Sequence, residues 1–161
     1  MNYLCIGKLV NTHGIKGEVR ILSKFKRKEL VFKKDFKFYI GRNKNEYIVE
    51  SYRVHKNFDM VVFKDNYNIN LVEFLKGSYV YVNKDDIKLN ENEFLAIDLI
   101  GFSVIIDDKL IGKVIDVVET NANDVLVLDF NIMIPYVKEF ILNINKDDKT
   151  ILVKNVKGLI S

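Results

Sequence analysis

The chain has 161 residues, of which 48% are hydrophobic and 29% are charged, so it can form one ordinary domain or two small ones and is not a disordered tail. Its net charge of +3 is unevenly divided. Residues 1–85 carry 17 Lys and Arg against 9 Asp and Glu, which gives a net charge of +8. Residues 86–161 carry 8 Lys and Arg against 13 Asp and Glu, which gives a net charge of −5. The single cysteine excludes an internal disulfide, and no apolar run approaches the roughly 18 residues of a membrane-spanning helix, so we expect a cytoplasmic protein with no membrane partner.

The first half of the sequence alternates apolar and polar residues with a period of two, which is typical of β-strands. β-Branched and aromatic residues, which strands prefer, are dense in these runs. Cys5 lies in the first of them, and we expect its thiol in the core, since a nucleophilic cysteine needs an exposed, electropositive setting. Strands are predicted over residues 3–11, 18–23, 36–41, 47–56, 58–65 and 78–83.

The turn HGIKG joins the first two predicted strands and holds Gly14 and Gly17. A phosphate-binding P-loop needs a longer glycine spacing, a following Lys-Ser/Thr pair and a helix, whereas a strand follows here. His13 could act as a general base only beside a partner, and neither it nor His55 is accompanied by a Ser or Cys constellation. We interpret the segment as a turn whose glycines adopt backbone angles closed to other residues.

The basic run SKFKRKEL at residues 23–30 is the best candidate for RNA binding. Its cations interleave with one aromatic residue, which suits phosphate contact combined with base stacking. The alternative is a solvated loop. The predicted RNA-binding residues are Lys24, Phe25, Lys26, Arg27 and Lys28.

Residues 70–77 break the strand pattern, because Leu71, Val72 and Leu75 follow a helical spacing between Asn70 as N-cap and Gly77 as stop. One short helix is therefore predicted. The polar stretch that follows coincides with the change in charge and is expected to be a linker at residues 85–93. It would separate an N-terminal domain, residues 1–84, from a C-terminal domain, residues 94–161.

The pattern of the second half also predicts strands, at residues 102–107, 111–119, 124–130, 131–137, 140–146 and 150–156. Many short strands with tight turns predict an all-β protein, and two halves of this size suit two small closed β-barrels in tandem. The turn ETNAND offers oxygen ligands at Glu119, Asn123 and Asp124, but a calcium site needs more of them on a longer loop. We expect no metal, no cofactor and no catalytic residues.

Three blocks of the sequence resemble the RimM family of ribosome maturation factors, which process the RNA of the small ribosomal subunit. The first is the opening IGKLVNTHGIKGEVRI, and the second runs from DLIGFSV to LIGKVIDVVETNANDVLVL. The third is IPYVKEFI with the ending VKGLI. The residues that carry the first two blocks are Ile6, Gly7, Lys8, Val10, Gly14, Ile15, Lys16, Gly17, Glu18 and Val19, then Gly101, Val104, Gly112, Val114, Glu119, Thr120, Asn123, Asp124, Val125 and Leu126.

The resemblance implies a six-stranded N-terminal barrel like those of translation factors and a C-terminal PRC barrel. It implies no catalysis, and as partners the 30S ribosomal subunit, its head ribosomal protein nineteen and 16S rRNA. The family usually carries an aromatic pair before the DLIG block, where this chain has Phe94 and Leu95. The basic half suits rRNA phosphates, and the acidic half suits a basic ribosomal protein.

On this basis we expect a monomer that contacts its ribosomal partner through the first turn and the start of the C-terminal domain. Two other classes stay open, namely an enzyme on a similar barrel and a PRC-barrel interaction module without a ribosome role. The predicted partner-binding residues are His13, Gly14, Lys16, Gly17, Glu18, Arg20, Phe94 and Leu95.

Overall fold

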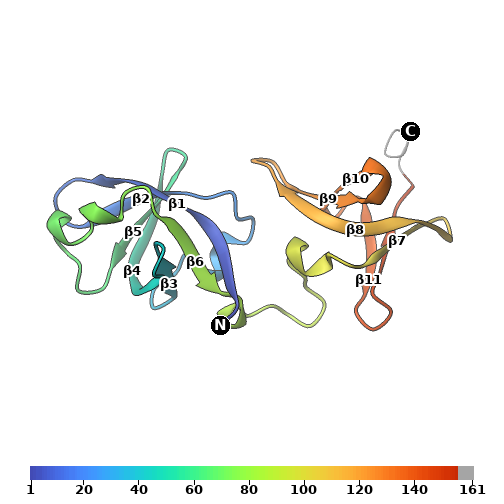
Figure 1. Cartoon of the computed structure of the whole chain (residues 1–161), viewed down its shortest axis with the longest axis horizontal. Coiled ribbons are helices and arrows are strands. Elements are labelled where there is room, and N and C mark those ends of the chain that lie inside the picture. The colour runs from blue at the N-terminus through green and yellow to red at the C-terminus, as the bar shows by residue number, and fades with distance from the viewer. Residues whose placement is uncertain (156–161) are drawn as a thin grey trace. The chain divides into compact units, whose positions relative to one another are not determined.

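The computed structural model describes residues 1–155, and the chain folds as two separate units, Met1–Lys88 and Leu89–Ser161 (Figure 1). The last residue of the predicted strand 150–156 and the VKGLI motif lie outside the described residues. Among the described residues, no helix is long and apolar enough to cross a membrane.

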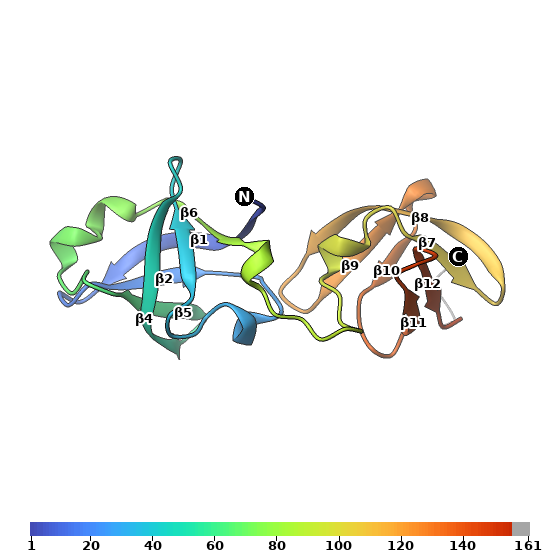
Figure 2. The same ribbon diagram turned by 90° about the horizontal axis from the view of Figure 1, so that it is seen from below.

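The first unit is a closed six-stranded barrel with the strand order β1-β2-β5-β4-β3-β6 (Figures 1 and 2). Antiparallel pairing of the first and last strands closes it, so that no sheet edge of this barrel is left exposed. The strands are β1 (Tyr3–His13), β2 (Glu18–Leu22), β3 (Lys37–Ile40), β4 (Asn45–His55), β5 (Phe58–Phe63) and β6 (Tyr79–Asn83).

Alternation along each strand sends one set of side chains into the barrel, where Leu9, Val19, Phe38 and Val80 are fully buried. The prediction for Cys5 is wrong, because its side chain is exposed. Cys5 precedes the inward-pointing Ile6, and a bulge follows it in the β1–β6 pairing, so the thiol lies on the outer face. The apolar character of its neighbours therefore did not decide its position.

The predicted helix in the first unit is instead two single 3-10 turns, η2 (Ile69–Leu71) and η3 (Glu73–Leu75). The N-cap is Asn68, whose side chain accepts a hydrogen bond from the backbone N–H of Asn70. Val72 and Leu75 are buried as the spacing predicts, whereas Leu71 is exposed. Short 3-10 pieces can bury two residues without the hydrogen bonds of an α-helix. The remaining 3-10 turns of the first unit are η1 (Lys28–Leu30) and η4 (Lys84–Asp86).

The second unit is a six-stranded sheet with the order β10-β9-β8-β7-β12-β11. Most neighbours pair antiparallel, but β12 lies between β7 and β11 and runs parallel to β7. Its core is apolar and includes Leu99, Val104, Leu126 and Ile151. The strands are β7 (Ser103–Ile106), β8 (Lys109–Glu119), β9 (Asp124–Leu128), β10 (Met133–Pro135), β11 (Ile141–Asn145) and β12 (Thr150–Val153), and the 3-10 turns are η5 (Ala96–Leu99) and η6 (Asp129–Asn131).

The all-β fold class is confirmed, and a strand is present in each of the twelve segments where one is predicted. The boundaries differ by a few residues: β1 runs two residues past its expected end and β8 begins two residues before its expected start, whereas most of the other strands are shorter than predicted.

Candidate functional site

The turn between β1 and β2 has a backbone conformation that favours its two glycines. Gly14 has φ +71° and Gly17 has φ +88°, both in the left-handed region. A Cβ on Gly17 would lie 2.1 Å from the carbonyl oxygen of Asn66, whereas a Cβ on Gly14 would meet nothing within 4 Å. The Ile15 carbonyl accepts a hydrogen bond of 3.0 Å from the Ile69 N–H. The turn is thus packed against the segment that follows β5.

This packing presents the tip of the turn to solvent. Ile15 is 75% exposed and Lys16 is also exposed. Next to them, Glu18 accepts hydrogen bonds of 2.9 and 2.7 Å from Nε and Nη2 of Arg53 on β4. The hydrogen bond from Arg53 lowers the pKa of the Glu18 carboxyl group. This bidentate ion pair joins the start of β2 to β4 across the outer face of β5.

A cluster of basic side chains adjoins the turn on this outer face. The Arg20 guanidinium donates a 2.6 Å hydrogen bond to Nδ1 of His13 and lies 5.7 Å from the centre of the Phe58 ring. The rings of His13 and His55 are 5.6 Å apart. Partial burial, followed by the nearby Arg53 and Lys56 cations, lowers the pKa of His55.

A hollow of about 440 Å³ opens beside this cluster. Apolar groups of Ile15 and Val62 line it together with polar groups, which suits a side chain or backbone segment of a partner. No pair of side chains in this hollow has the arrangement of a nucleophile with its general base. The lining residues are His13, Gly14, Ile15, Lys16, Glu18 and Val62.

The structure therefore brings six of the predicted partner-binding residues together on one surface, which we call the turn surface: His13, Gly14, Lys16, Gly17, Glu18 and Arg20. Sequence reasoning did not identify Arg53 and His55 as part of it, because they lie about 40 residues away in the chain and meet β2 only through strand pairing. It also did not identify Tyr67 and Leu71, exposed apolar residues that flank the Ile69 contact with the turn.

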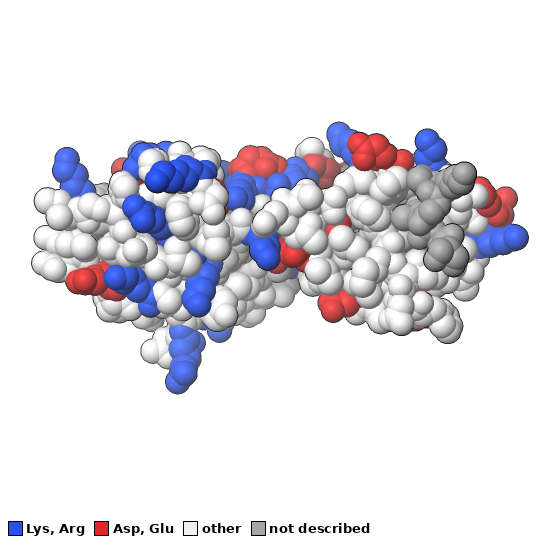
Figure 3. Space-filling view, turned by 90° about the horizontal axis from the view of Figure 1, so that it is seen from above, with Lys and Arg blue, Asp and Glu red and all other residues white. Residues whose placement is uncertain are grey.

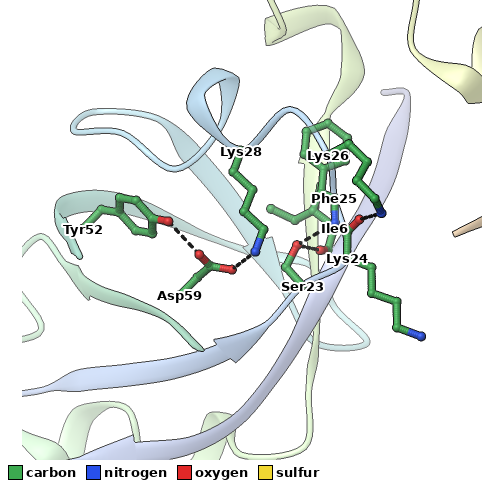
Figure 4. A network of polar contacts seen from close by, with 8 residues as sticks. All are labelled: Ile6, Ser23, Lys24, Phe25, Lys26, Lys28, Tyr52 and Asp59. Atoms are coloured by element: carbon green, nitrogen blue, oxygen red, sulfur yellow. Dashed lines mark hydrogen bonds and ion pairs between the residues drawn. The ribbon is translucent and has the colours of Figure 1, made fainter. Parts of the chain in front are cut away.

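The predicted RNA-binding run is folded onto the barrel instead of projecting from it (Figure 4). Phe25 is only 8% exposed, and its N–H donates a 3.1 Å hydrogen bond to Oγ of Ser23. Its ring packs in the core, so it is not presented for base stacking. Lys24 is exposed, whereas Nζ of Lys26 donates a 2.5 Å hydrogen bond to the Lys24 carbonyl. Arg27 pairs with Glu29 at 2.6 Å.

Lys28 in the same run has an internal partner. Its Nζ lies 2.7 Å from Oδ2 of Asp59, whose other oxygen accepts a 2.6 Å hydrogen bond from the Tyr52 hydroxyl (Figure 4). Asp59 is 1% exposed, so these two donors replace the water that a carboxylate requires. Burial and the nearby Asp59 raise the pKa of Tyr52, which keeps its hydroxyl a donor.

In the second unit, Phe94 and Leu95 serve packing. Leu95 is buried, and the Phe94 ring packs edge to face against Phe102 at 6.4 Å. The Phe94 carbonyl accepts a 2.7 Å hydrogen bond from the Tyr136 hydroxyl. A better candidate for a contact in this unit is Phe130, which is 84% exposed and has φ +63°. Its sequence context, DFN at the end of a strand, gives no signal of this exposure.

Within residues 1–155, no group of three or more His, Cys, Asp and Glu side chains is placed to hold a metal ion. On the face drawn in Figure 3, Lys and Arg side chains predominate over the first unit.

Comparisons with known proteins agree over both units. The family model of the RimM N-terminal domain matches residues 4–87, and that of the RimM PRC barrel domain matches residues 96–159. A curated ribosome maturation factor RimM from Staphylococcus epidermidis is 41% identical over 162 residues, covering 96% of this chain and 97% of the relative. One from Staphylococcus aureus is 40% identical with the same coverage.

Two solved structures are also similar. One is described as a 16S ribosomal RNA processing protein RimM from Pseudomonas aeruginosa, with 20% identity, a TM-score of 0.44, and coverage of 96% of this chain and 98% of that one. The other is the N-terminal domain of RimM from Thermus thermophilus, with 19% identity, a TM-score of 0.47, and coverage of 55% and 98%.

Proposed function

This chain belongs to the RimM family of ribosome maturation factors, and from that membership we propose that it binds the immature small ribosomal subunit and supports 16S rRNA processing and maturation of the subunit head. It acts as a monomer in the cytoplasm, without catalysis and without a cofactor. Membership in a family of maturation factors, established over both units at about 40% identity to curated relatives, is the observation that supports this role.

The unequal charge of the two halves supports a division of labour. Residues 1–85 carry a net charge of +8 and engage rRNA phosphates, with displacement of counterions. Residues 86–161 carry a net charge of −5 and engage the head ribosomal protein nineteen, which is basic. Holding that protein would keep the head in a state that can still fold.

The turn surface is the part of the first unit that we propose touches the subunit. The observation that carries this assignment is the fixed backbone of residues 14–17, which holds Ile15 and Lys16 in solvent beside a cluster of basic side chains. Ordering before binding reduces the entropy lost on association. In the second unit, Phe130 is the proposed anchor, because an exposed aromatic ring on a short 3-10 turn can insert into a partner's pocket.

Co-sedimentation with immature small subunits at low salt tests the proposal. We expect the intact chain to sediment with the subunits, Lys16→Ala to weaken this binding, and Lys76→Ala, which removes an exposed lysine elsewhere in the first unit, to leave it unchanged. Absence of sedimentation by the intact chain would contradict the proposal and favour an interaction module without a ribosome role.

A pull-down with head protein nineteen tests the second unit. Phe130→Ala is expected to reduce capture about tenfold, whereas Leu142→Ala, at another exposed apolar residue of the same unit, serves as the matched control. Equal capture by both variants would remove Phe130 from the interface.

A further inference from the structure

The outer face of the barrel along β6, β1 and β3 carries four tyrosines, which we call the tyrosine platform: Tyr3, Tyr39, Tyr79 and Tyr81. β6 lies between the other two strands. Tyr81 pairs with Cys5 of β1 on one side and with Tyr39 of β3 on the other. Because Val80 and Val82 point into the barrel, Tyr79 and Tyr81 point outward on the same face.

Three of the four rings, those of Tyr3, Tyr39 and Tyr81, form a connected surface, and Tyr79 is on the same face of β6. The Tyr3 ring centre is 5.3 Å from that of Tyr39 and 6.3 Å from that of Tyr81, and both pairs meet edge to face. Tyr39 is buried beneath this layer, whereas Tyr79 is 54% exposed and Tyr3 is also exposed. The buried Tyr39 ring supports that of Tyr3, whose orientation is therefore largely fixed before any ligand binds.

Two lysines accompany the rings. Nζ of Lys44, in the turn between β3 and β4, lies 4.5 Å from the centre of the Tyr81 ring and 5.4 Å from that of Tyr3. Nζ of Lys8 on β1 lies 5.6 Å from the centre of the Tyr79 ring. These are cation–π contacts on an open surface, each worth about 0.5–1 kcal/mol, so they yield readily to a phosphate.

We propose that the tyrosine platform binds a stretch of unpaired RNA, with bases stacked on Tyr79, Tyr81 and Tyr3 and phosphates held by Lys8 and Lys44. Aromatic faces interleaved with cations are the features that recognise single strands without regard to sequence. Tyr79 and Tyr81 are two residues apart on a strand, hence roughly 7 Å. Bases stacked in a double helix are about 3.4 Å apart, so only a strand whose bases have separated can place one on each ring.

Two carboxylates, those of Glu46 and Asp86, lie near the Tyr39 side chain. Burial, followed by the proximity of Glu46 and Asp86, raises the pKa of the Tyr39 hydroxyl. Nζ of Lys37 lies 4.0 Å from the Glu46 carboxylate and partly offsets its charge. A phosphate beside Tyr39 would be repelled by Glu46 and Asp86, so the phosphate contacts are assigned to Lys8 and Lys44.

This inference rests on the proposed function only for the origin of the RNA, namely unpaired nucleotides of the immature subunit. It moves base stacking from the basic run at 23–30, where Phe25 is buried, to a face that the sequence alone did not indicate. The signal in the sequence was the alternation YVYV of β6, whose outward tyrosines are indistinguishable from ordinary strand residues until β1 and β3 are placed beside them.

The test uses the full chain and a single-stranded RNA of about eight nucleotides, within the range that small β-barrels cover. The chain has 8 tyrosines and no tryptophan, so quenching of its intrinsic fluorescence reports stacking on tyrosine directly. We expect Tyr79→Leu to weaken binding on the order of tenfold. Phe74→Leu is the matched control, because Phe74 is an aromatic residue that is 70% exposed in the same unit but is not one of the platform residues.

A second pair of variants tests the phosphate contacts. Lys44→Gln is expected to weaken binding and to lower its salt dependence by about one released counterion, while Lys76→Gln leaves both unchanged. A duplex of the same sequence is expected to bind more weakly than the single strand.

Equal effects of Tyr79→Leu and Phe74→Leu, or equal affinity for the duplex, would overturn the platform. So would binding of a proline-rich peptide at these tyrosines in place of RNA. Co-sedimentation separates this result from the proposed function, since a chain that sediments with small subunits but binds no single strand refutes the platform alone. A chain that binds the strand through Tyr79 but does not sediment refutes the proposed function alone.

Discussion

At the scale of single residues, two glycines that look equivalent in the turn HGIKG have different constraints. Both have positive φ, and sequence reasoning assigns them that shared role. Only Gly17 is also approached by another part of the chain, at Asn66, nearly 50 residues later. Spacing and composition carry no information about such a long-range approach, whereas a backbone requirement is local and can be predicted.

Gly17→Ala is therefore expected to destabilise the protein more than Gly14→Ala. At position 14, alanine lowers the free energy of unfolding only by the cost of the left-handed backbone, about 1 kcal/mol. At position 17, its Cβ must also displace the Asn66 carbonyl. The free energies of unfolding in urea measure the difference. Equal losses would show that the Asn66 segment gives way without cost.

The Glu18–Arg53 ion pair makes a pH-dependent contribution to stability. The pKa of Glu18 is lowered in the folded state, so the contribution is present above the ordinary value of 4.5 and is lost as pH falls through the lower, folded-state pKa. We expect Glu18→Gln to cost up to about 1 kcal/mol at neutral pH, since Arg53 is half exposed, and less in acid.

Thermal unfolding of the original chain and of Glu18→Gln, compared between pH 7 and pH 3, measures how far the difference in their stability shrinks in acid. Glu91→Gln, at an exposed glutamate of the second unit, is the control and should show a constant, small difference. A Glu18→Gln cost that persists unchanged in acid would mean that the pair contributes through shape and not charge.

At the scale of elements, the strands could be predicted and their neighbours could not. Each segment alternates apolar and polar residues, so all twelve strands can be predicted from their own sequence. Which residue lies beside another in the sheet depends instead on pairing between distant segments. The basic run at 23–30 shows that a segment's own sequence does not reveal which distant residues its side chains contact. Its lysines look alike in sequence, yet Lys28 reaches Asp59, 31 residues away, while Lys24 is exposed.

Lys28→Met is accordingly expected to destabilise the first unit, although the position looks like a surface lysine. The variant leaves the Asp59 carboxylate buried with the Tyr52 hydroxyl still donating to it but without its cationic partner, at a cost of about 2 kcal/mol. Lys24→Met in the same run should change stability by less than about 0.5 kcal/mol. Urea unfolding followed by circular dichroism distinguishes them, and two equal, small effects would contradict a structural role for Lys28.

At the scale of the whole molecule, each unit has its own core and its own sheet. The first closes by pairing β1 with β6, and the second brings β12 back beside β7. The charge difference between the halves can be read from composition alone, but the composition does not locate the surfaces that use it. The turn surface and the tyrosine platform both depend on strand order.

Residues 1–88 and 89–161, produced separately, are therefore each expected to unfold cooperatively, because none of the twelve described strands is shared between the two units. In pull-downs, the first piece should retain RNA and the second should retain head protein nineteen. Capture of that protein by the first piece alone would show that the proposed division of labour is wrong.

The parallel pairing of β12 with β7 also sets an order of events during translation. β12 follows every other described strand of its unit in the chain, yet it occupies an interior position of the sheet, between β7 and β11. The first barrel can close as soon as β6 leaves the exit tunnel, whereas the second sheet waits for residues 150–153. A nascent chain stalled before that point would present a finished barrel followed by a sheet with an unfilled place, which is a state that chaperones and proteases recognise.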